Sequence, residues 1–211
     1  MKTVAIIDYG SGNLHSAAKA FERVASETGH KVLVTNKPDQ LKSASHIVLP
    51  GVGAFGDCRQ GLFAVAGMVE ALTAEVINKK KPFLGICVGM QLLAEKGFER
   101  GEHQGLGWIK GEVKKIVPKD KSLKVPHMGW NELRIKQAGH QLLKGIKDGD
   151  HAYFVHSYGF ICADKKNVLA EVEYSGVITA AIGRENIMGV QFHPEKSQET
   201  GMKIIGNFLG I

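Results

Sequence analysis

Residues 81–89 read KPFLGICVG, and this stretch decides the fold. An apolar strand pattern runs directly into Cys87, and a helical pattern follows over 88–96. Gly85 and Gly89 permit the tight strand-to-helix turn called a nucleophile elbow, here with cysteine in place of serine. The positive N-terminal end of the following helix would favour the nucleophilic thiolate. The alternative is a buried cysteine on a turn with glycines nearby.

The rest of the first half alternates strand and helix patterns around this elbow. Strand patterns occupy residues 3–8, 31–35 and 46–50, and helical patterns occupy 13–28 and about 58–78. This alternation predicts βαβ units and a parallel sheet covered by helices on both faces.

The second half is built from strands joined by short turns. Strand patterns occupy residues 108–117, 131–136, 151–161, 167–174, 177–183 and 186–192, and a closing helix is expected over 198–209. The pieces Ser175–Gly176 and Arg184–Glu185–Asn186 resemble hairpin turns. We therefore predict an α/β fold with three layers: an open, mostly parallel sheet, helices on both faces, and an antiparallel extension in the C-terminal half.

Length and composition are those of an ordinary globular protein. The 211 residues, with 44% hydrophobic and 23% charged side chains, favour one domain over residues 1–211. Three cysteines, without CxxC spacing, favour neither a disulfide framework nor a zinc site. The first apolar run ends at Asp8, too short for a signal peptide, and no run approaches the ~20 residues that span a bilayer. We expect a soluble cytoplasmic protein with no membrane association.

The formal net charge of +6 does not by itself indicate nucleic-acid binding. The lysines form small groups that are not interleaved with aromatic residues, as a surface that stacks bases would require. Solvated loops explain them, or a face that meets a phosphate ligand or an acidic partner. We expect no nucleic-acid partner.

A second motif is QFHPE over 191–195. Pro194 favours an extended backbone at His193, which places the imidazole at the end of the preceding strand. A carboxylate two residues later, Glu195, can orient the ring and stabilise its charged form. A histidine at a strand end can be purely structural. Together with Cys87, however, these residues form the nucleophile, base and orienting group expected at the carboxyl edge of an open α/β sheet.

A third motif, PGVGAF over 50–55, directly follows a predicted strand. Its backbone N–H groups could bind a developing oxyanion together with the amide of Val88, although a plain turn explains the glycines too. The segment GSGNL over 10–14 lacks the third glycine of a dinucleotide fingerprint. Six histidines, His15, His30, His46, His103, His140 and His151, lack metal-ligand spacing. We therefore expect neither a cofactor nor a metal.

The segments GICVGMQLL and GVQFHPEKS resemble the two active-site motifs of the class I glutamine amidotransferases. Five further segments in the same order resemble one branch of that family, the glutaminase subunit of imidazole glycerol phosphate synthase. They are IDYGSGNL (7–14), PGVGAF (50–55), VPHMGWN (125–131), FVHSY (154–158) and HPEKSQ (193–198). The resemblance extends from end to end of the chain. Val88, where leucine is usual, and Gly159, where a bulkier residue is common, depart from the pattern.

The resemblance implies a role for each matching residue. Cys87 would be the nucleophile, His193 the general base and acid, and Glu195 the group that orients His193. Glutamine would contact Gly53, Gln91, His156, Ser157 and Tyr158. The oxyanion segment would comprise Val52, Gly53 and Val88, and the Val52 peptide would reorient when the partner is liganded. The partner would contact Asn13, Trp130, Asn131 and Lys196.

The implied reaction is hydrolysis of glutamine to glutamate and ammonia. The ammonia would pass to a cyclase subunit, a (β/α)₈ barrel, that makes imidazole glycerol phosphate and aminoimidazole carboxamide ribotide. Three alternatives stay open from the sequence: a paralogous glutaminase subunit that supplies a synthase of a nucleotide-sugar pathway, a cysteine peptidase or γ-glutamyl hydrolase, and a binding subunit without activity.

Overall fold

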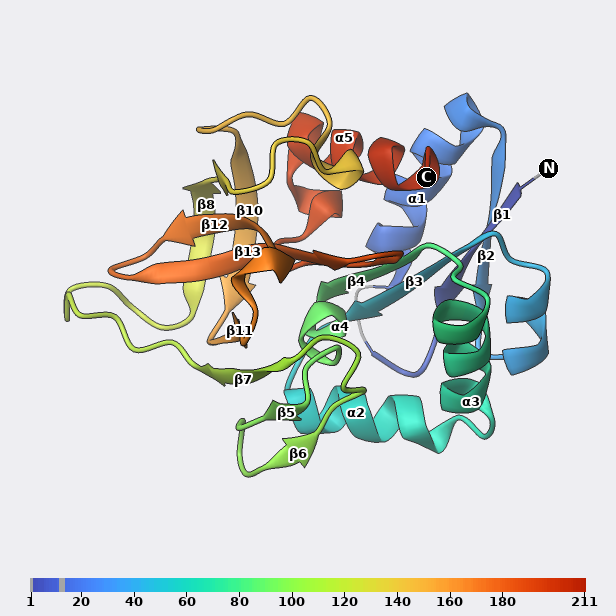
Figure 1. Cartoon of the computed structure of the whole chain (residues 1–211), viewed down its shortest axis with the longest axis horizontal. Coiled ribbons are helices and arrows are strands. Elements are labelled where there is room, and N and C mark those ends of the chain that lie inside the picture. Colours follow the sequence, from blue (N-terminus) through green and yellow to red (C-terminus); the bar gives the residue numbers. More distant parts are fainter. Residues whose placement is uncertain (1, 12–13) are drawn as a thin grey trace.

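The computed structural model describes residues 2–11 and 14–211, and an eight-stranded mixed sheet organises them (Figure 1). The strand order is β2-β1-β3-β4-β14-β13-β12-β9. Five neighbouring strands are parallel: β2 (His30–Thr35), β1 (Lys2–Ile7), β3 (His46–Gly51), β4 (Phe83–Cys87) and β14 (Ile187–Val190). The antiparallel extension comprises β13 (Val177–Arg184), β12 (Val168–Glu173) and β9 (Arg134–Ile135). The predicted fold class is confirmed.

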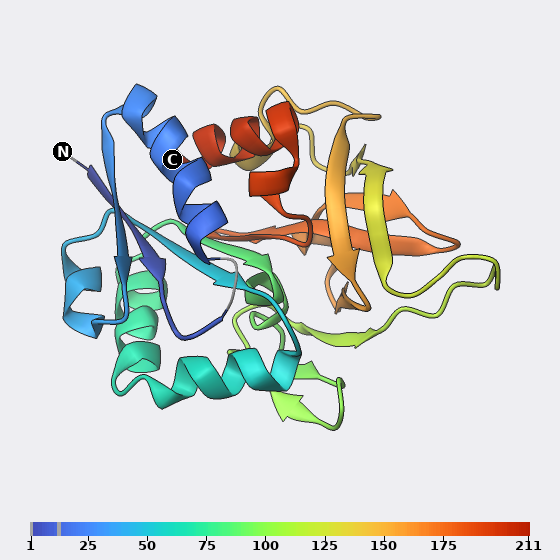
Figure 2. The ribbon, with the colours of Figure 1, turned by 180° about the vertical axis from the view of Figure 1, so that it is seen from behind.

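Helices cover both faces of this sheet, as Figures 1 and 2 show from opposite sides. One face carries α1 (Leu14–Thr28) and α5 (Gln198–Leu209), which pack against each other through the rings of Phe21 and Phe208. The other face carries α2 (Phe55–Ala64), α3 (Met68–Leu72), the π-helix η2 (Thr73–Asn78) and α4 (Val88–Gln91). Every residue of the central strands β3 and β4 is buried, as expected for strands covered on both sides.

Two smaller sheets extend from the second half of the chain. One pairs β10 (His151–His156) with β8 (His127–Glu132), and the other has the order β11 (Tyr158–Cys162), β7 (Gly111–Lys115), β5 (Lys96–Gly97), β6 (His103–Gln104). The single strand predicted over 151–161 is therefore wrong. It divides at Ser157 because its two parts pair with different partners, β8 and β7.

The predicted helices over 58–78 and 88–96 are wrong in extent. The first begins at Phe55 and is interrupted at residues 65–67, where Gly67 adopts a φ of +76°. The second, α4, ends at Gln91. The carbonyl groups of residues 92–95 accept hydrogen bonds from the backbone of residues 105–109, so a distant segment replaces the helical partners. The closing helix 198–209 and both predicted hairpin turns are confirmed.

Residues 2–11 and 14–211 also contain four short 3₁₀ turns: η1 (Pro38–Lys42), η3 (Gln141–Leu143), η4 (Lys165–Asn167) and η5 (Pro194–Lys196). Within the described residues, no single helix is long and apolar enough to cross a membrane. By length and composition alone, only the pair formed by α2 and residues 68–78 qualifies, and it is bent by 92°.

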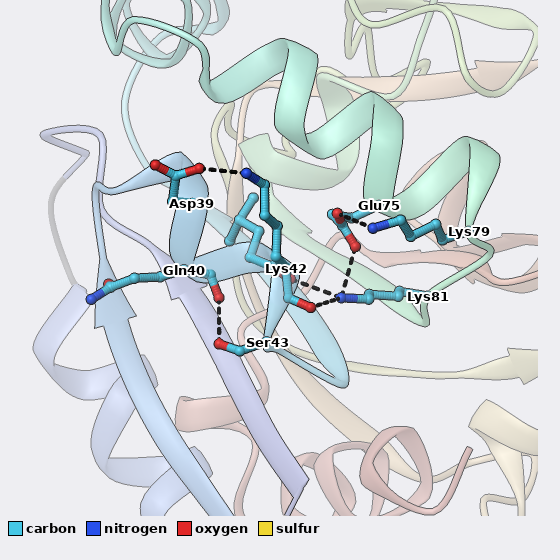
Figure 3. A network of polar contacts seen from close by, with 8 residues as sticks. Asp39, Gln40, Lys42, Ser43, Glu75, Lys79 and Lys81 are labelled. Carbon is cyan, nitrogen blue, oxygen red and sulfur yellow. Dashed lines mark hydrogen bonds and ion pairs between the residues drawn. The ribbon is translucent and has the colours of Figure 1, made fainter.

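A buried carboxylate ties η1 and η2 to the start of β4 (Figure 3). Glu75, whose side chain is 3% exposed, forms ion pairs with Lys79 at 2.8 Å and Lys81 at 2.7 Å. Lys81 Nζ also donates to the carbonyl groups of Leu41 and Lys42. Burial alone would raise the pKa of Glu75, but the hydrogen bonds from the two lysines outweigh burial and hold the pKa below its ordinary value.

We expect Lys81→Met to reduce the free energy of unfolding by about 1.5–3 kcal/mol at neutral pH, because a charged donor to Glu75 and to two carbonyl groups is lost. Since the pKa of Glu75 is depressed in the folded state, its contribution is present above its unfolded pKa of 4.5 and is lost as the pH falls through the folded value. Denaturant unfolding should show that the difference in free energy of unfolding between Lys81→Met and the unmodified chain becomes smaller below that pH.

Asp39→Ala is the matched control, because Asp39 forms an exposed ion pair with Lys42 in the same region (Figure 3). It should leave stability unchanged at every pH. A loss in Lys81→Met that does not vary with pH would show that the Glu75 ion pair contributes nothing.

Candidate active site

The carboxyl ends of three adjacent parallel strands bring the predicted motifs together. In the register of the sheet, Gly51 at the end of β3 lies opposite Cys87 at the end of β4, and Val190 at the end of β14 lies opposite Ile86. The PGVG segment, the cysteine and the QFHPE segment therefore meet at one edge, as expected for an open α/β sheet.

Cys87 occupies a strained elbow. Its φ of +55° and ψ of −112° are rare for a residue with a side chain. A Cβ on Gly85 would lie 2.6 Å from the carbonyl oxygen of Gly89, and a Cβ on Gly89 would lie 1.8 Å from the carbonyl oxygen of Leu49. Both positions thus require glycine, which confirms the predicted elbow. Because α4 has a single turn, its dipole contributes less than the predicted longer helix would.

His193 and Glu195 follow β14 as a buried pair. The backbone of His193 is extended, with φ −97° and ψ 102°, as Pro194 predicts. Its Nδ1 lies 2.8 Å from Oε1 of Glu195, and both side chains are 3% exposed. Tyr153 O accepts the His193 N–H, and Ser197 Oγ donates to His193 O, so the backbone that carries the ring is fixed.

The surroundings of His193 favour its charged form. Burial alone would lower the pKa of the imidazole, but the neighbouring Cys87 sulfur and the Glu195 carboxylate outweigh burial and raise the pKa to about 9. Within the described residues, Nε2 is buried and makes no hydrogen bond of acceptable geometry. Nε2 is therefore available for proton transfer.

Cys87 and His193 open into a cavity of about 500 Å³. This volume lies in the usual range for small-molecule sites. Every residue for which a substrate or oxyanion role is predicted lines it: Val52, Gly53, Val88, Gln91, His156, Ser157 and Tyr158. Glu195 does not line the cavity and reaches it through His193.

Three further lining residues, Glu99, Pro126 and Val155, escaped the sequence analysis. Glu99 accepts the N–H of Phe55 at 2.9 Å and brings a carboxylate to the cavity, which suits the ammonium group of an amino acid. It stands in a stretch without a motif, and only the short sheet containing β5 and β6 brings that stretch to the cavity. Local sequence therefore gave no signal for it.

The predicted oxyanion segment is held by contacts outside the cavity. Val52 N donates to Ser11 Oγ at 2.9 Å, and Cys58 Sγ donates to Val52 O at 3.2 Å. Tyr9 OH donates to Pro50 O at 2.6 Å. Ser11 does not line the cavity, so the Val52 N–H points away from the place where an oxyanion would form.

A pair of buried glutamines supports the sulfur. Gln91 Nε2 donates to Tyr158 O and to Gln191 Oε1, at 3.0 Å each, which uses both of its hydrogens. Gln191 Nε2 donates to Cys87 Sγ at 3.6 Å. Gln191 is the first residue of the QFHPE motif, but its contact with the cysteine could not be read from the sequence.

The residues predicted to contact the partner do not all lie on one surface. Trp130 is 47% exposed beside the 61% exposed Met128, whereas Asn131 is half-buried on the other face of β8. Lys196 lines the cavity, with Nζ 5.7 Å from the centre of the Tyr153 ring. Asn13 lies outside the described residues. Within the part of the chain that the structure describes, no group of three His, Cys, Asp or Glu side chains could hold a metal ion.

The chain is similar to known proteins over almost its whole length. The family model described as glutamine amidotransferase class-I matches residues 5–210. The chain is 57% identical to the imidazole glycerol phosphate synthase subunit HisH of Rhodospirillum rubrum over 98% of this chain and 97% of that one. It is 56% identical to the subunit of the same name in Brucella suis, again over 98% and 97%.

Solved structures show the same fold at low sequence identity. A glutamine amidotransferase crystal structure aligns with a TM-score of 0.73 at 16% identity, covering 99% of each chain. A glutamine amidotransferase from Thermotoga maritima aligns with a TM-score of 0.66 at 17% identity, covering 92% of this chain and 76% of that one. From the full-length family match and the two near relatives it follows that this chain belongs to the class I glutamine amidotransferase family.

Proposed function

We propose that this chain is the glutaminase subunit of an imidazole glycerol phosphate synthase, hydrolysing glutamine and passing the ammonia to a cyclase subunit. The observation that carries the chemistry is His193, held by buried Glu195 and sharing a cavity with the Cys87 sulfur. Relatives 53–57% identical over almost their whole length carry the name of this synthase subunit, which favours this role over a paralogue of a nucleotide-sugar pathway.

The reaction would begin with attack of the Cys87 thiolate on the carboxamide carbon of glutamine. The carbonyl π electrons move to oxygen and form a tetrahedral oxyanion. His193, protonated on Nε2, gives this proton to the departing nitrogen, and ammonia leaves as the C–N bond breaks. Water then loses a proton to His193 and attacks the thioester, which releases glutamate and the thiolate.

Glu195 would keep the imidazole in the correct state throughout. Its Oε1 accepts from Nδ1, so the proton that His193 exchanges with cysteine, ammonia and water is the one on Nε2. The carboxylate also stabilises the imidazolium that exists before ammonia leaves and again after water has lost its proton to His193.

A glutaminase subunit of this kind would pass its ammonia directly to a partner and would not release it into solution. Ammonia becomes ammonium in bulk water and loses its nucleophilicity, so direct passage protects it. We propose that the exposed face of β8 around Trp130, with Asn131, Lys196 and Asn13, meets a (β/α)₈ cyclase subunit in the cytoplasm. The whole of residues 1–211 would act as one domain.

The Val52 peptide suggests how activity would be restrained. Its N–H is bonded to Ser11 and its carbonyl to Cys58, so a donor for the oxyanion is turned away in the isolated chain. We propose that liganded partner releases this peptide, which then reorients toward the cavity.

The central test is Cys87→Ala. We expect glutamine hydrolysis by the reconstituted complex to fall at least about a thousandfold, because the nucleophile is removed. Circular dichroism and co-purification with the cyclase subunit should be unchanged. Retained glutaminase activity would remove Cys87 from the mechanism, and failure of the unmodified chain to bind a cyclase would remove the proposed partner.

Glu195→Gln tests the buried pair. The alkaline limb of glutamine hydrolysis should lie near the His193 pKa of about 9, because deprotonation above that pH removes the general acid. Without the carboxylate the pKa falls, so the limb should move toward neutral pH and kcat should drop by about 10²-fold or more. A pH–rate profile with an unmoved alkaline limb would assign that limb to another group.

Ser11→Ala tests the restraint on Val52. Loss of one hydrogen bond of about 1 kcal/mol should raise the glutaminase activity of the isolated chain about fivefold, since the inward orientation becomes more populated. Ser26→Ala, which removes an exposed hydroxyl on α1, is the control and should change nothing. Full activity of the unmodified isolated chain, or no gain in Ser11→Ala, would contradict the restraint.

A further inference from the structure

A continuous line of buried and partly buried hydrogen bonds runs from strand β8 to the Cys87 sulfur. It begins with Asn131, passes through the rings of His127 and His156 to the Tyr158 carbonyl, and continues through Gln91 and Gln191 to Cys87. The successive distances are 3.1, 3.0, 2.8, 3.0, 3.0 and 3.6 Å. His127, His156 and both glutamines are at most 6% exposed.

The direction of each bond near β8 follows from the backbone. Asn131 Oδ1 accepts the N–H of Glu132, and Asn131 Nδ2 donates to the Glu173 carbonyl, which fixes the orientation of the amide. The same Nδ2 faces His127 Nε2, so this ring nitrogen must accept. His127 then carries its proton on Nδ1 and donates to His156 Nε2.

The other end of the line gives the same answer independently. The Tyr158 carbonyl can only accept, so His156 Nδ1 must carry a proton. A neutral His156 therefore accepts at Nε2, which requires His127 to donate from Nδ1. Both rings are neutral with the proton on Nδ1, and all bonds from Asn131 to the carbonyl point one way. Burial, which lowers the pKa of each ring to about 4, favours this state.

The Tyr158 carbonyl is the junction of the line. It accepts from His156 on one side and from Gln91 on the other, so both lone pairs are used. Gln91 in turn donates to the Gln191 Oε1, and the Gln191 Nε2–H is directed at Cys87 Sγ. An N–H donated to sulfur stabilises the thiolate relative to the thiol.

The His127 ring is confined as well as bonded. It stacks on Phe154 at 4.9 Å between ring centres and lies 4.1 Å from the centre of Tyr174. On the same strand, Met128 and Trp130 project to the exposed face. A movement of the exposed face of β8 would therefore also move its inner face, where the line of hydrogen bonds begins.

We propose that His127 is a positioning residue for Cys87: as a neutral donor to His156 it fixes the Tyr158 carbonyl, and through Gln91 it aims the Gln191 amide at the sulfur. It also connects the exposed face of β8 to the nucleophile. This inference deepens the proposed glutaminase function and rests on it for its catalytic meaning. The geometry of the sulfur can nevertheless be tested without glutamine or partner.

The test is the pH dependence of Cys87 alkylation by iodoacetamide in the full chain, followed by mass spectrometry of the peptide that contains Cys87. His127→Phe keeps an aromatic ring between Phe154 and Tyr174 but removes both hydrogen bonds. We expect the midpoint to move upward by about half a pH unit or more, because the thiolate loses an oriented donor. His127→Asn, whose amide N–H can replace Nδ1–H, should restore most of the original midpoint.

Phe154→Leu is the matched control, because it removes the ring stacked on His127 without touching a hydrogen bond of the line. Its midpoint should equal that of the unmodified chain. An unmoved midpoint in His127→Phe, or an equal shift in Phe154→Leu, would overturn the proposal.

Two further measurements separate the possible failures. Long-range proton–nitrogen NMR of the unmodified chain should show both His127 and His156 protonated on Nδ1, and an Nε2 proton on either would overturn the line even if His127→Phe did not fold. In the complex with the cyclase subunit, His127→Phe should lower kcat several-fold and should change KM less. If the complex formed by the unmodified chain cannot hydrolyse glutamine, the proposed function is wrong. The alkylation result would still test the position of the sulfur.

Discussion

The close approach of Gly89 to the Leu49 carbonyl is the constraint on which the site depends. With no Cβ at Gly89, the turn after β4 can lie directly against β3, and Cys87 is forced into its strained backbone conformation. The same approach sets the Val52 segment beside the sulfur, since β3 and β4 end in register. Any side chain at Gly89 would separate Cys87 from the segment that contains Val52.

Three buried histidines, two that line the cavity and one behind it, show how neighbouring groups set the charge of one residue type. His193 faces a carboxylate and a sulfur, and its pKa rises to about 9. His127 and His156 face an amide, a carbonyl and each other, and burial lowers the pKa of each to about 4. One ring is thereby suited to move protons, while the other two stay neutral and keep a fixed direction of donation.

The sequence predicted the structure correctly where local patterns carry the information. The central parallel strands, the elbow at Cys87 and the helix over 198–209 were all predicted, because period, glycine spacing and burial agree there. It failed where distant segments compete for backbone groups: residues 105–109 take the carbonyl groups that would have extended α4, and β8 and β7 divide the strand predicted over 151–161. Local helix and strand propensities cannot predict competition between distant segments for the same backbone groups.

By itself, the sequence determined the chemical inventory of this protein: a cysteine between two glycines, a histidine held extended by proline, and a carboxylate two residues later. Only the tertiary structure decided how these groups act on one another. The outward Val52 peptide, the carboxylate of Glu99 in the cavity, and the line from Asn131 to the sulfur each depend on at least one contact between residues 41 to 104 positions apart. Hydrogen-bond direction and charge depend on distances of a few ångströms, and folding alone sets those distances.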